Sequence, residues 1–126
     1  MDIIKKNPTT IGNTGEMIAL AFLKTKGMHL IEHQYRTQMG EIDLIMKHNN
    51  DIVFVEVRYR KNIEYGDPEI TVDYYKQKKL IRTAQLYNLQ NKWTDAFNLR
   101  FDVIGISGNQ LNHKIEWIEN AFWVGY

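Results

Sequence analysis

Asp43 and Glu56 are the residues whose types and placement most clearly predict chemistry in this sequence. They lie in two predicted strands, 41–47 and 52–59, which flank the turn-forming group 48–51. If the turn is centred on its two asparagines, the carboxylates face each other across an antiparallel pair, with Cβ atoms about 5 Å apart. At an effective dielectric constant of about 20, charges at that distance repel each other by roughly 3 kcal/mol. We therefore expect either a cation between the carboxylates or a proton on one of them.

The same register separates apolar from polar side chains, which favours it over a register shifted by a bulge. One face would pair Leu44 with Val55, Ile42 with Val57, and Met46 with Val53. The other face would pair Ile45 with Phe54, Asp43 with Glu56, and Glu41 with Arg58. The acidic pair is therefore predicted on the more polar face of the hairpin.

Two interpretations of this acidic pair stay open. Hard divalent cations prefer carboxylate oxygens, so the pair could hold a metal ion. Alternatively, Arg58, Arg60 or a lysine neutralises the pair on a solvated face of the sheet. The four histidines have no metal-ligand spacing, which argues against a zinc site.

Other polar residues have both a functional and a structural interpretation. Glu16, in the first turn of a predicted helix, could join the acidic pair or form a capping box with Asn13. Gln77 and Lys76 lie on or beside the core-facing side of a second helix and could point toward the pair, or Gln77 could satisfy a backbone group. Asp102 is predicted to be structural, with an arginine as its partner.

The elements that must position these residues follow from hydrophobic periodicity and end signals. Helices are predicted over 15–26, ended by Gly27, and from the N-cap Asp73 to about residue 89. Strands are predicted over 29–36, 41–47, 52–59, 99–106 and 114–118, with a long connection over 60–72. The order α-β-β-β-α-β-β predicts an α/β domain with a central mixed sheet flanked by helices.

Length and composition favour one globular domain over residues 1–126, with 44% hydrophobic and 25% charged residues. The absence of cysteine excludes disulfides, thiol nucleophiles and thiolate metal sites. Residues 1–8 do not have the pattern of a signal peptide, and no apolar run is long enough to span a membrane, so we expect a cytoplasmic protein. Neither a P-loop, a GxGxxG nor a GxSxG motif occurs.

The net charge of +1 does not by itself indicate a nucleic-acid-binding protein. Basic residues are nevertheless concentrated locally, because the stretch 76–82 holds four of them and no acid. Lys78, Lys79 and Arg82 project from the polar side of the second predicted helix, and Arg58, Arg60 and Lys61 form another basic group. Any nucleic-acid contact is thus predicted at a local patch.

Taken together, these residues resemble the YraN-like family of small bacterial proteins, which have a restriction-endonuclease-like fold. The matching segments are Gly15-Glu16 with Ala19, Gly40-Glu41-Ile42-Asp43-Leu44-Ile45, Val53-Phe54-Val55-Glu56-Val57-Arg58 with Arg60, Lys76-Gln77 with Leu80, Arg100-Phe101-Asp102-Val103, and Ala121-Phe122. They span nearly the whole chain in the family's order. That family is in turn similar to the PD-(D/E)xK nucleases, especially archaeal Holliday-junction resolvases.

The resemblance implies a Mg²⁺ or Mn²⁺ site. Asp43 would take the place of the motif's aspartate, Glu56 that of its second acid, and Glu16 that of the helix-borne glutamate, with the Val57 carbonyl as a further ligand. Arg58 stands where the superfamily has lysine; arginine cannot act as a general base, although it could hold the scissile phosphate. Lys76 is the nearest candidate for a shifted lysine.

The function this implies is a divalent-metal-dependent endonuclease-like protein acting on DNA phosphodiesters, with branched DNA among the candidate substrates. Arg58, Arg60, Lys78, Lys79 and Arg82 would contact the nucleic acid. The alternative is a non-catalytic nucleic-acid-binding or assembly module that keeps the nuclease fold, which the arginine at position 58 favours. A homodimer is a further hypothesis, drawn from the apolar C-terminal segment 121–126 and from the relatives.

Overall fold

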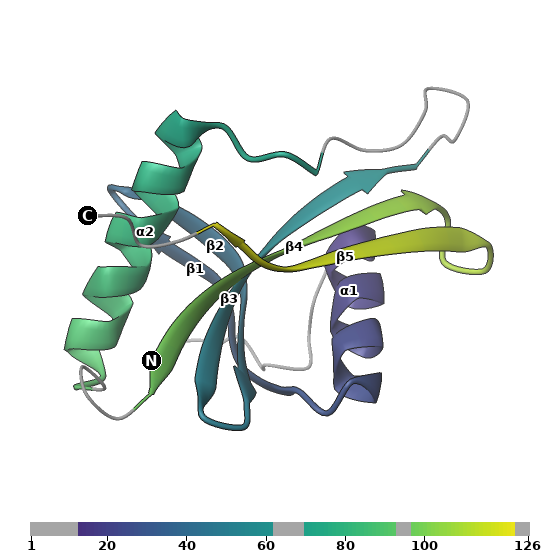
Figure 1. Cartoon of the computed structure of the whole chain (residues 1–126). Helices are drawn as coiled ribbons and strands as arrows, with labels where there is room; N and C mark the ends of the chain where they lie inside the picture. Colours follow the sequence, from purple (N-terminus) through teal and green to yellow (C-terminus); the bar gives the residue numbers. More distant parts are fainter. Residues whose placement is uncertain (1–12, 62–69, 93–96, 123–126) are drawn as a thin grey trace, which may run out of the picture.

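The computed structural model describes residues 13–61, 70–92 and 97–122. Its elements are α1 (Thr14–Thr25), β1 (His29–Thr37), β2 (Gly40–His48), β3 (Asp51–Arg60), α2 (Tyr74–Gln90), β4 (Asn98–Gly108) and β5 (His113–Phe122), as Figure 1 shows. This is the predicted order, although β5 continues beyond its predicted end at Ile118 to Phe122. The apolar C-terminal residues 123–126 and most of the predicted connection, residues 62–69, lie outside the described residues.

The five strands form one mixed sheet in the order β1-β2-β3-β4-β5. β3 and β4 are parallel, and every other neighbouring pair is antiparallel. Parallel neighbours need a crossover connection, and α2 lies within the connection from β3 to β4. No helix among the described residues is long and apolar enough to cross a membrane.

The hairpin of β2 and β3 has the predicted register over its inner part. Leu44 pairs with Val55, Ile45 with Phe54, and Met46 with Val53, down to His48 and Asp51. The turn consists of two residues, and Asn49 has a φ of 56°, a left-handed conformation that asparagine tolerates better than most side chains. The prediction that the turn is centred on the asparagine pair is therefore confirmed.

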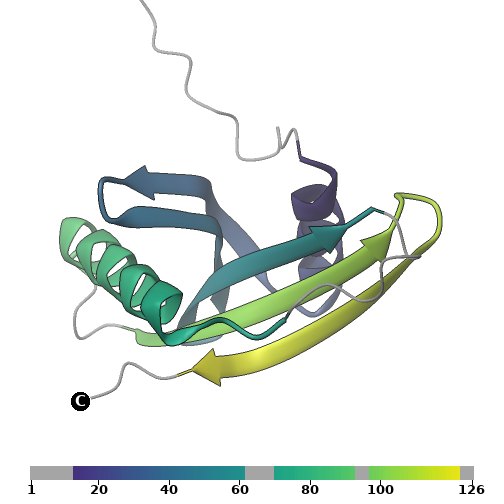
Figure 2. The same cartoon turned by 90° about the horizontal axis from the view of Figure 1, so that it is seen from above.

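The two helices cover opposite faces of this sheet (Figure 2). On the α1 side, helix residues pack against alternate strand residues: Ile18, Ala19, Leu20 and Leu23 against Leu44, Met46, Val53, Val55, Ile104 and Ile106. On the α2 side, Leu80, Ala84 and Tyr87 pack with Ile45, Ile52, Phe54, Phe101, Val103 and Phe122. The period of two in the strands thus divides the hydrophobic residues between two half-cores.

Ile42 contradicts the predicted segregation of the hairpin. It packs in the α2-side cluster, whereas its predicted partner Val57 packs on the α1 side. The ladder between β2 and β3 runs only as far as Leu44 and Val55, and β2 continues in register with β1, where Ile42 pairs with Tyr35. Because β2 parts from β3 at this point, side chains beyond it no longer follow the alternation of the hairpin.

Local hydrogen bonds define both helix starts as predicted. Asn13 Oδ1 accepts the N–H of Glu16 at 3.2 Å, and Asp73 Oδ1 accepts the N–H of Lys76 at 2.8 Å. Gly27, with a φ of +87°, follows the end of α1. The register of β1 with β2 shifts by a bulge between Leu30 and Glu32.

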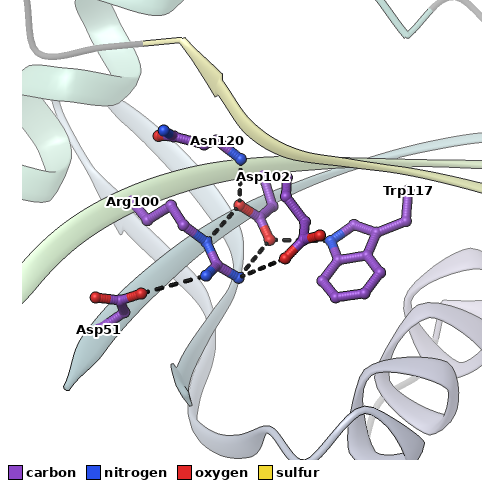
Figure 3. A network of polar contacts seen from close by, with 6 residues as sticks. Asp51, Arg100, Asp102, Trp117 and Asn120 are labelled. Carbon is purple, nitrogen blue, oxygen red and sulfur yellow. Dashed lines mark hydrogen bonds and ion pairs between the residues drawn. The ribbon is translucent and has the colours of Figure 1, made fainter. Parts of the chain in front are cut away.

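Asp102 is structural, as predicted, and lies at the centre of the polar network in Figure 3. It is 1% exposed and accepts two hydrogen bonds from the Arg100 guanidinium, at 2.9 and 3.0 Å. Its oxygens also accept the indole N–H of Trp117 and the backbone N–H of Asn120, each at 2.9 Å. Arg100 further binds Asp51 at 3.2 Å. The network therefore joins β3, β4 and β5 and satisfies a buried carboxylate.

Candidate metal and nucleic-acid site

Three carboxyl groups converge where β2 parts from β3. Glu16 of α1 is 4% exposed and Glu56 of β3 is 6% exposed, whereas Asp43 is partly buried at the end of the β2–β3 ladder. Asp43 Oδ2 accepts the backbone N–H of Val57 at 2.8 Å, and its carboxyl group shares a hydrogen bond with Glu56. Asp43 and Glu56 are therefore not partners in the β2–β3 ladder, but their side chains meet just beyond its end.

Electrostatics at this cluster favour a proton on Asp43. Burial, followed by the negative charge of Glu56, raises the pKa of Asp43 from 3.8 to about 8. The Val57 N–H lowers this pKa, while the charge of Glu16 and the hydrogen bond with Glu56 raise it further. The cluster therefore holds more negative charge than its surroundings can solvate, which is the condition under which a carboxyl group retains its proton or a cation binds.

Two cations already lie against Glu56. Lys76 Nζ lies 2.6 Å from Glu56 Oε2, and Arg58 Nε lies 3.0 Å from the same oxygen. This arrangement corresponds to the ion-pair interpretation of the acidic pair, with both Arg58 and a lysine contributing. Across the described ranges, no group of three histidine, aspartate or glutamate side chains is arranged to hold a metal ion. For a metal to bind, Glu56 would have to exchange these cations for it.

The structure brings Lys76 to the acidic pair but not Gln77. The Gln77 amide donates to the carbonyl of Val72 at 2.7 Å, which is the structural alternative considered for this residue. The predicted contact of Glu41 with Arg58 is wrong, because Glu41 forms an ion pair with Arg36 of β1 at 3.3 Å. The reason is again the departure of β2 from β3, which leaves Glu41 beside β1.

The predicted nucleic-acid contacts fall into two groups. Arg58 and Arg60 lie half-buried near the end of β3, close to the acidic pair in sequence and, for Arg58, in direct contact with it. Lys78, Lys79 and Arg82 are exposed on α2, as predicted.

Val57 was predicted as a further metal ligand through its carbonyl oxygen. Its backbone N–H donates a hydrogen bond to Asp43, and the role of its carbonyl as a metal ligand stays a prediction.

Two aromatic residues beside this basic group were not among the site residues predicted from the sequence. Tyr74 and Tyr75 open α2 and are 71% and 75% exposed. The ammonium group of Lys78 lies 5.3 Å from the ring centroid of Tyr74, and that of Lys79 lies 5.6 Å from the ring centroid of Tyr75. The available signal was the spacing of each tyrosine four residues before a lysine at a helix start.

A surface depression of about 380 Å³ connects these elements. Its lining includes Tyr75, Lys76 and Lys79 of α2 together with Gly40 and Glu41 of β2. A volume of this size is within the range of ligand-binding clefts. Because Lys76 both lines the depression and contacts Glu56, the depression borders the acidic cluster.

Comparisons with known proteins identify similar chains in bacteria. The family described as uncharacterised protein family UPF0102 matches residues 15–106, a span that includes the acidic cluster and α2. A UPF0102 protein of Legionella pneumophila is 40% identical over 114 residues, covering 90% of this chain and 95% of that relative. A relative from Alkaliphilus oremlandii is 44% identical over 113 residues (89% and 97%), and one from Clostridium botulinum is 41% identical over 116 residues (90% and 94%).

Proposed function

The chain belongs to the UPF0102 family, the YraN-like group that its motifs indicate, and we propose that it is a cytoplasmic, divalent-metal-dependent endonuclease acting on DNA phosphodiesters. The observation that carries this proposal is the convergence of Glu16, Asp43 and Glu56 beside exposed basic residues. Buried like charges have no structural benefit in a sheet, so their convergence supports a role in binding a cation.

The donor chemistry of the cluster fits Mg²⁺ or Mn²⁺. Carboxylate oxygens are the ligands that these hard cations prefer, and Glu16, Asp43 and Glu56 each supply one carboxyl group. A divalent ion would offset the burial and the charge of Glu56 that now raise the pKa of Asp43, so Asp43 would bind the ion as the carboxylate. Bound there, the ion would lower the pKa of a water molecule and neutralise charge on a phosphate.

Arg58 and Lys76 would then act on the DNA. Both cations now contact the same oxygen of Glu56, and an ion held by Glu56 would free them. Arg58 has a permanently charged guanidinium, which suits it to hold the scissile phosphate and to stabilise charge in the transition state. The Lys76 amine lines the depression and, once released from Glu56, would be the candidate group to donate a proton to the leaving group.

Calorimetric titration of Mn²⁺ tests this site. We expect the wild type to bind Mn²⁺ and the variant Asp43→Asn/Glu56→Gln to lose binding, because two of its anionic ligands are removed. Glu116→Gln is a matched control, since Glu116 is an exposed acid on β5. Each titration is repeated with DNA present, and failure of the wild type to bind Mn²⁺ in both conditions would refute the metal site.

Cleavage assays test the catalytic part of the proposal. Duplex, single-stranded and branched DNA are incubated with Mn²⁺ and wild-type protein or Asp43→Asn. Asparagine retains an oxygen acceptor for the Val57 N–H, so this variant should fold while hydrolysis is abolished. Full activity of purified Asp43→Asn would contradict the assignment of Asp43.

A second candidate function is a nucleic-acid-binding module without catalysis. The observation in its favour is that Arg58 and Lys76 already neutralise Glu56 and so occupy the place of a cation. Such a module should bind DNA through Lys78, Lys79 and Arg82, with an affinity that falls as salt rises and does not depend on divalent metal. Metal-independent binding by a wild type that cleaves no DNA would favour this function.

A further inference from the structure

The start of α2 carries two large aromatic side chains that the fold does not bury. Tyr74 and Tyr75 are 71% and 75% exposed, whereas Tyr87 on the same helix is buried in the core. Neighbouring tyrosines with most of their rings in solvent are available for contact with another molecule. Because Asp73 caps the helix at Lys76 N–H, the backbone that carries these rings is held in place.

The charged side chains of α2 itself all have one sign, and the acid nearest to the rings in sequence is the N-cap Asp73. α2 includes four basic residues, Lys76, Lys78, Lys79 and Arg82, and its sequence contains no acidic residue. Lys78 lies against the ring of Tyr74 and Lys79 against the ring of Tyr75. Each tyrosine therefore forms a unit of an aromatic ring and an adjacent cation, repeated at successive positions of the helix.

A nucleic-acid strand with unpaired bases has the complementary pattern. Each nucleotide combines a flat base, which can stack on an aromatic side chain, with a phosphate, which attracts a cation. In a duplex the base faces are already stacked on one another, so the tyrosines would find only the phosphate backbone. The paired ring and cation units therefore favour an unpaired strand over a duplex.

This surface is continuous with the acidic cluster. Tyr75 and Lys79 line the same depression as Lys76, and Lys76 Nζ lies 2.6 Å from Glu56. A strand held on α2 would therefore pass over Lys76, the residue that contacts Glu56. Two acids line the depression, Glu41 and Asp73. Glu41 is paired with Arg36 and Asp73 accepts the N–H of Lys76, so each repels a phosphate less than an isolated carboxylate would.

We propose that Tyr74 and Tyr75 stack on bases of an unpaired DNA strand while Lys78, Lys79 and Arg82 hold its phosphates. This inference rests on the proposed function for the choice of DNA as the nucleic acid, and it narrows the substrate class to DNA with an unpaired segment next to the cleaved bond. Tyr74 and Tyr75 thereby become substrate-recognition residues.

Fluorescence anisotropy with labelled DNA in EDTA tests the proposal without metal or catalysis. The probes are a single strand, the corresponding duplex and a fork that has both. We expect the wild type to bind the single strand and the fork more tightly than the duplex. Tyr74→Ala/Tyr75→Ala should weaken single-strand binding by at least about tenfold and leave duplex binding unchanged, because stacking is lost and the cations remain.

Three further variants separate stacking from other effects. Tyr74→Phe/Tyr75→Phe keeps both rings and should retain single-strand affinity. Leu89→Ala is the matched control, because it removes another exposed apolar side chain from the opposite end of α2 and should change nothing. Lys78→Gln/Lys79→Gln should weaken binding of every probe and reduce its dependence on salt.

The result that would overturn the proposal is a loss of affinity on Tyr74→Ala/Tyr75→Ala that is equal for single strand and duplex, or no loss at all. Absence of single-strand binding by the wild type would also overturn it and would leave a protein partner as the occupant of this surface. A wild type that binds through the tyrosines but cleaves nothing with Mn²⁺ refutes the endonuclease and supports this surface. Asp43-dependent cleavage with tyrosine-independent binding refutes this surface alone.

Discussion

Replacing Asp43 with asparagine should change how the stability of the metal-free protein depends on pH. The pKa of Asp43 is raised from 3.8 to about 8 in the folded protein, by burial first and then by Glu56. Between these values the folded chain keeps a proton that the unfolded chain has released. The stabilisation that this proton provides is complete below the pKa of the unfolded chain. It is lost as the pH rises toward the folded-state pKa of about 8. Asparagine does not titrate, so Asp43→Asn lacks this dependence.

The magnitude follows from proton linkage. Over the window between the two pKa values, the free energy of unfolding of the wild type should fall relative to Asp43→Asn by about 1.4 kcal/mol per pH unit. From about pH 5 to about pH 7 the difference between the two proteins should therefore change by about 3 kcal/mol. Urea denaturation of both proteins in EDTA, at several pH values across this window, measures it directly.

Parallel stability curves for wild type and Asp43→Asn between about pH 5 and about pH 7 would refute this electrostatic reasoning. Glu116→Gln, which removes an exposed acid from β5, should give a curve parallel to the wild type. Mn²⁺ at about 100 times its Kd should stabilise the wild type by about 2.7 kcal/mol if the ion binds the folded state alone. It should not stabilise Asp43→Asn to the same extent, since a ligand has been removed.

Other perturbations test the remaining contacts. Lys76→Gln should raise the affinity for Mn²⁺ severalfold in calorimetry, because a competing cation is removed, and should lower DNA cleavage; a loss of both would contradict the competition. Arg100→Met should destabilise the fold by about 3 kcal/mol in urea denaturation, since it leaves the buried Asp102 charge without its main partner, and an unchanged midpoint would contradict this account. Gly15→Ala should lower stability by about 1–3 kcal/mol, because the added Cβ would lie 2.7 Å from the Cβ of Tyr59. A melting temperature equal to that of the wild type would show that α1 and β3 can move apart without cost.

Features governed by neighbouring residues could be predicted from the sequence. Asn13 and Asp73 cap their helices because each side chain needs to reach an N–H only three residues ahead. The β2–β3 register follows from the turn at Asn49 and Asn50, since a two-residue loop leaves little freedom for its strands. The same local rule was sufficient to propose Asp43 as a partner of Glu56.

The prediction was wrong where β2 stops following β3. Ile42 packs on the α2 side, and Glu41 pairs with Arg36 in place of Arg58. Both errors come from extending the hairpin register to the strand end, although the ladder between β2 and β3 ends at Leu44. The hairpin sequence alone does not show where the two strands separate, because β1 and α2 also pack against β2.

The sequence by itself determined the order of elements, the helix caps and the inner hairpin register, because each depends on short-range pattern and turn geometry. The proximity of Asp43 to Glu56 was also predicted, although their side chains meet beyond the end of the ladder. Only the tertiary structure decided that Lys76 and Arg58 both contact Glu56 and that Glu16 acts on Asp43. It also decided that the rings at the start of α2 remain in solvent. These relations join elements distant in sequence, and they exist because α1 and α2 pack against opposite faces of one sheet and bring their first turns to its acidic residues.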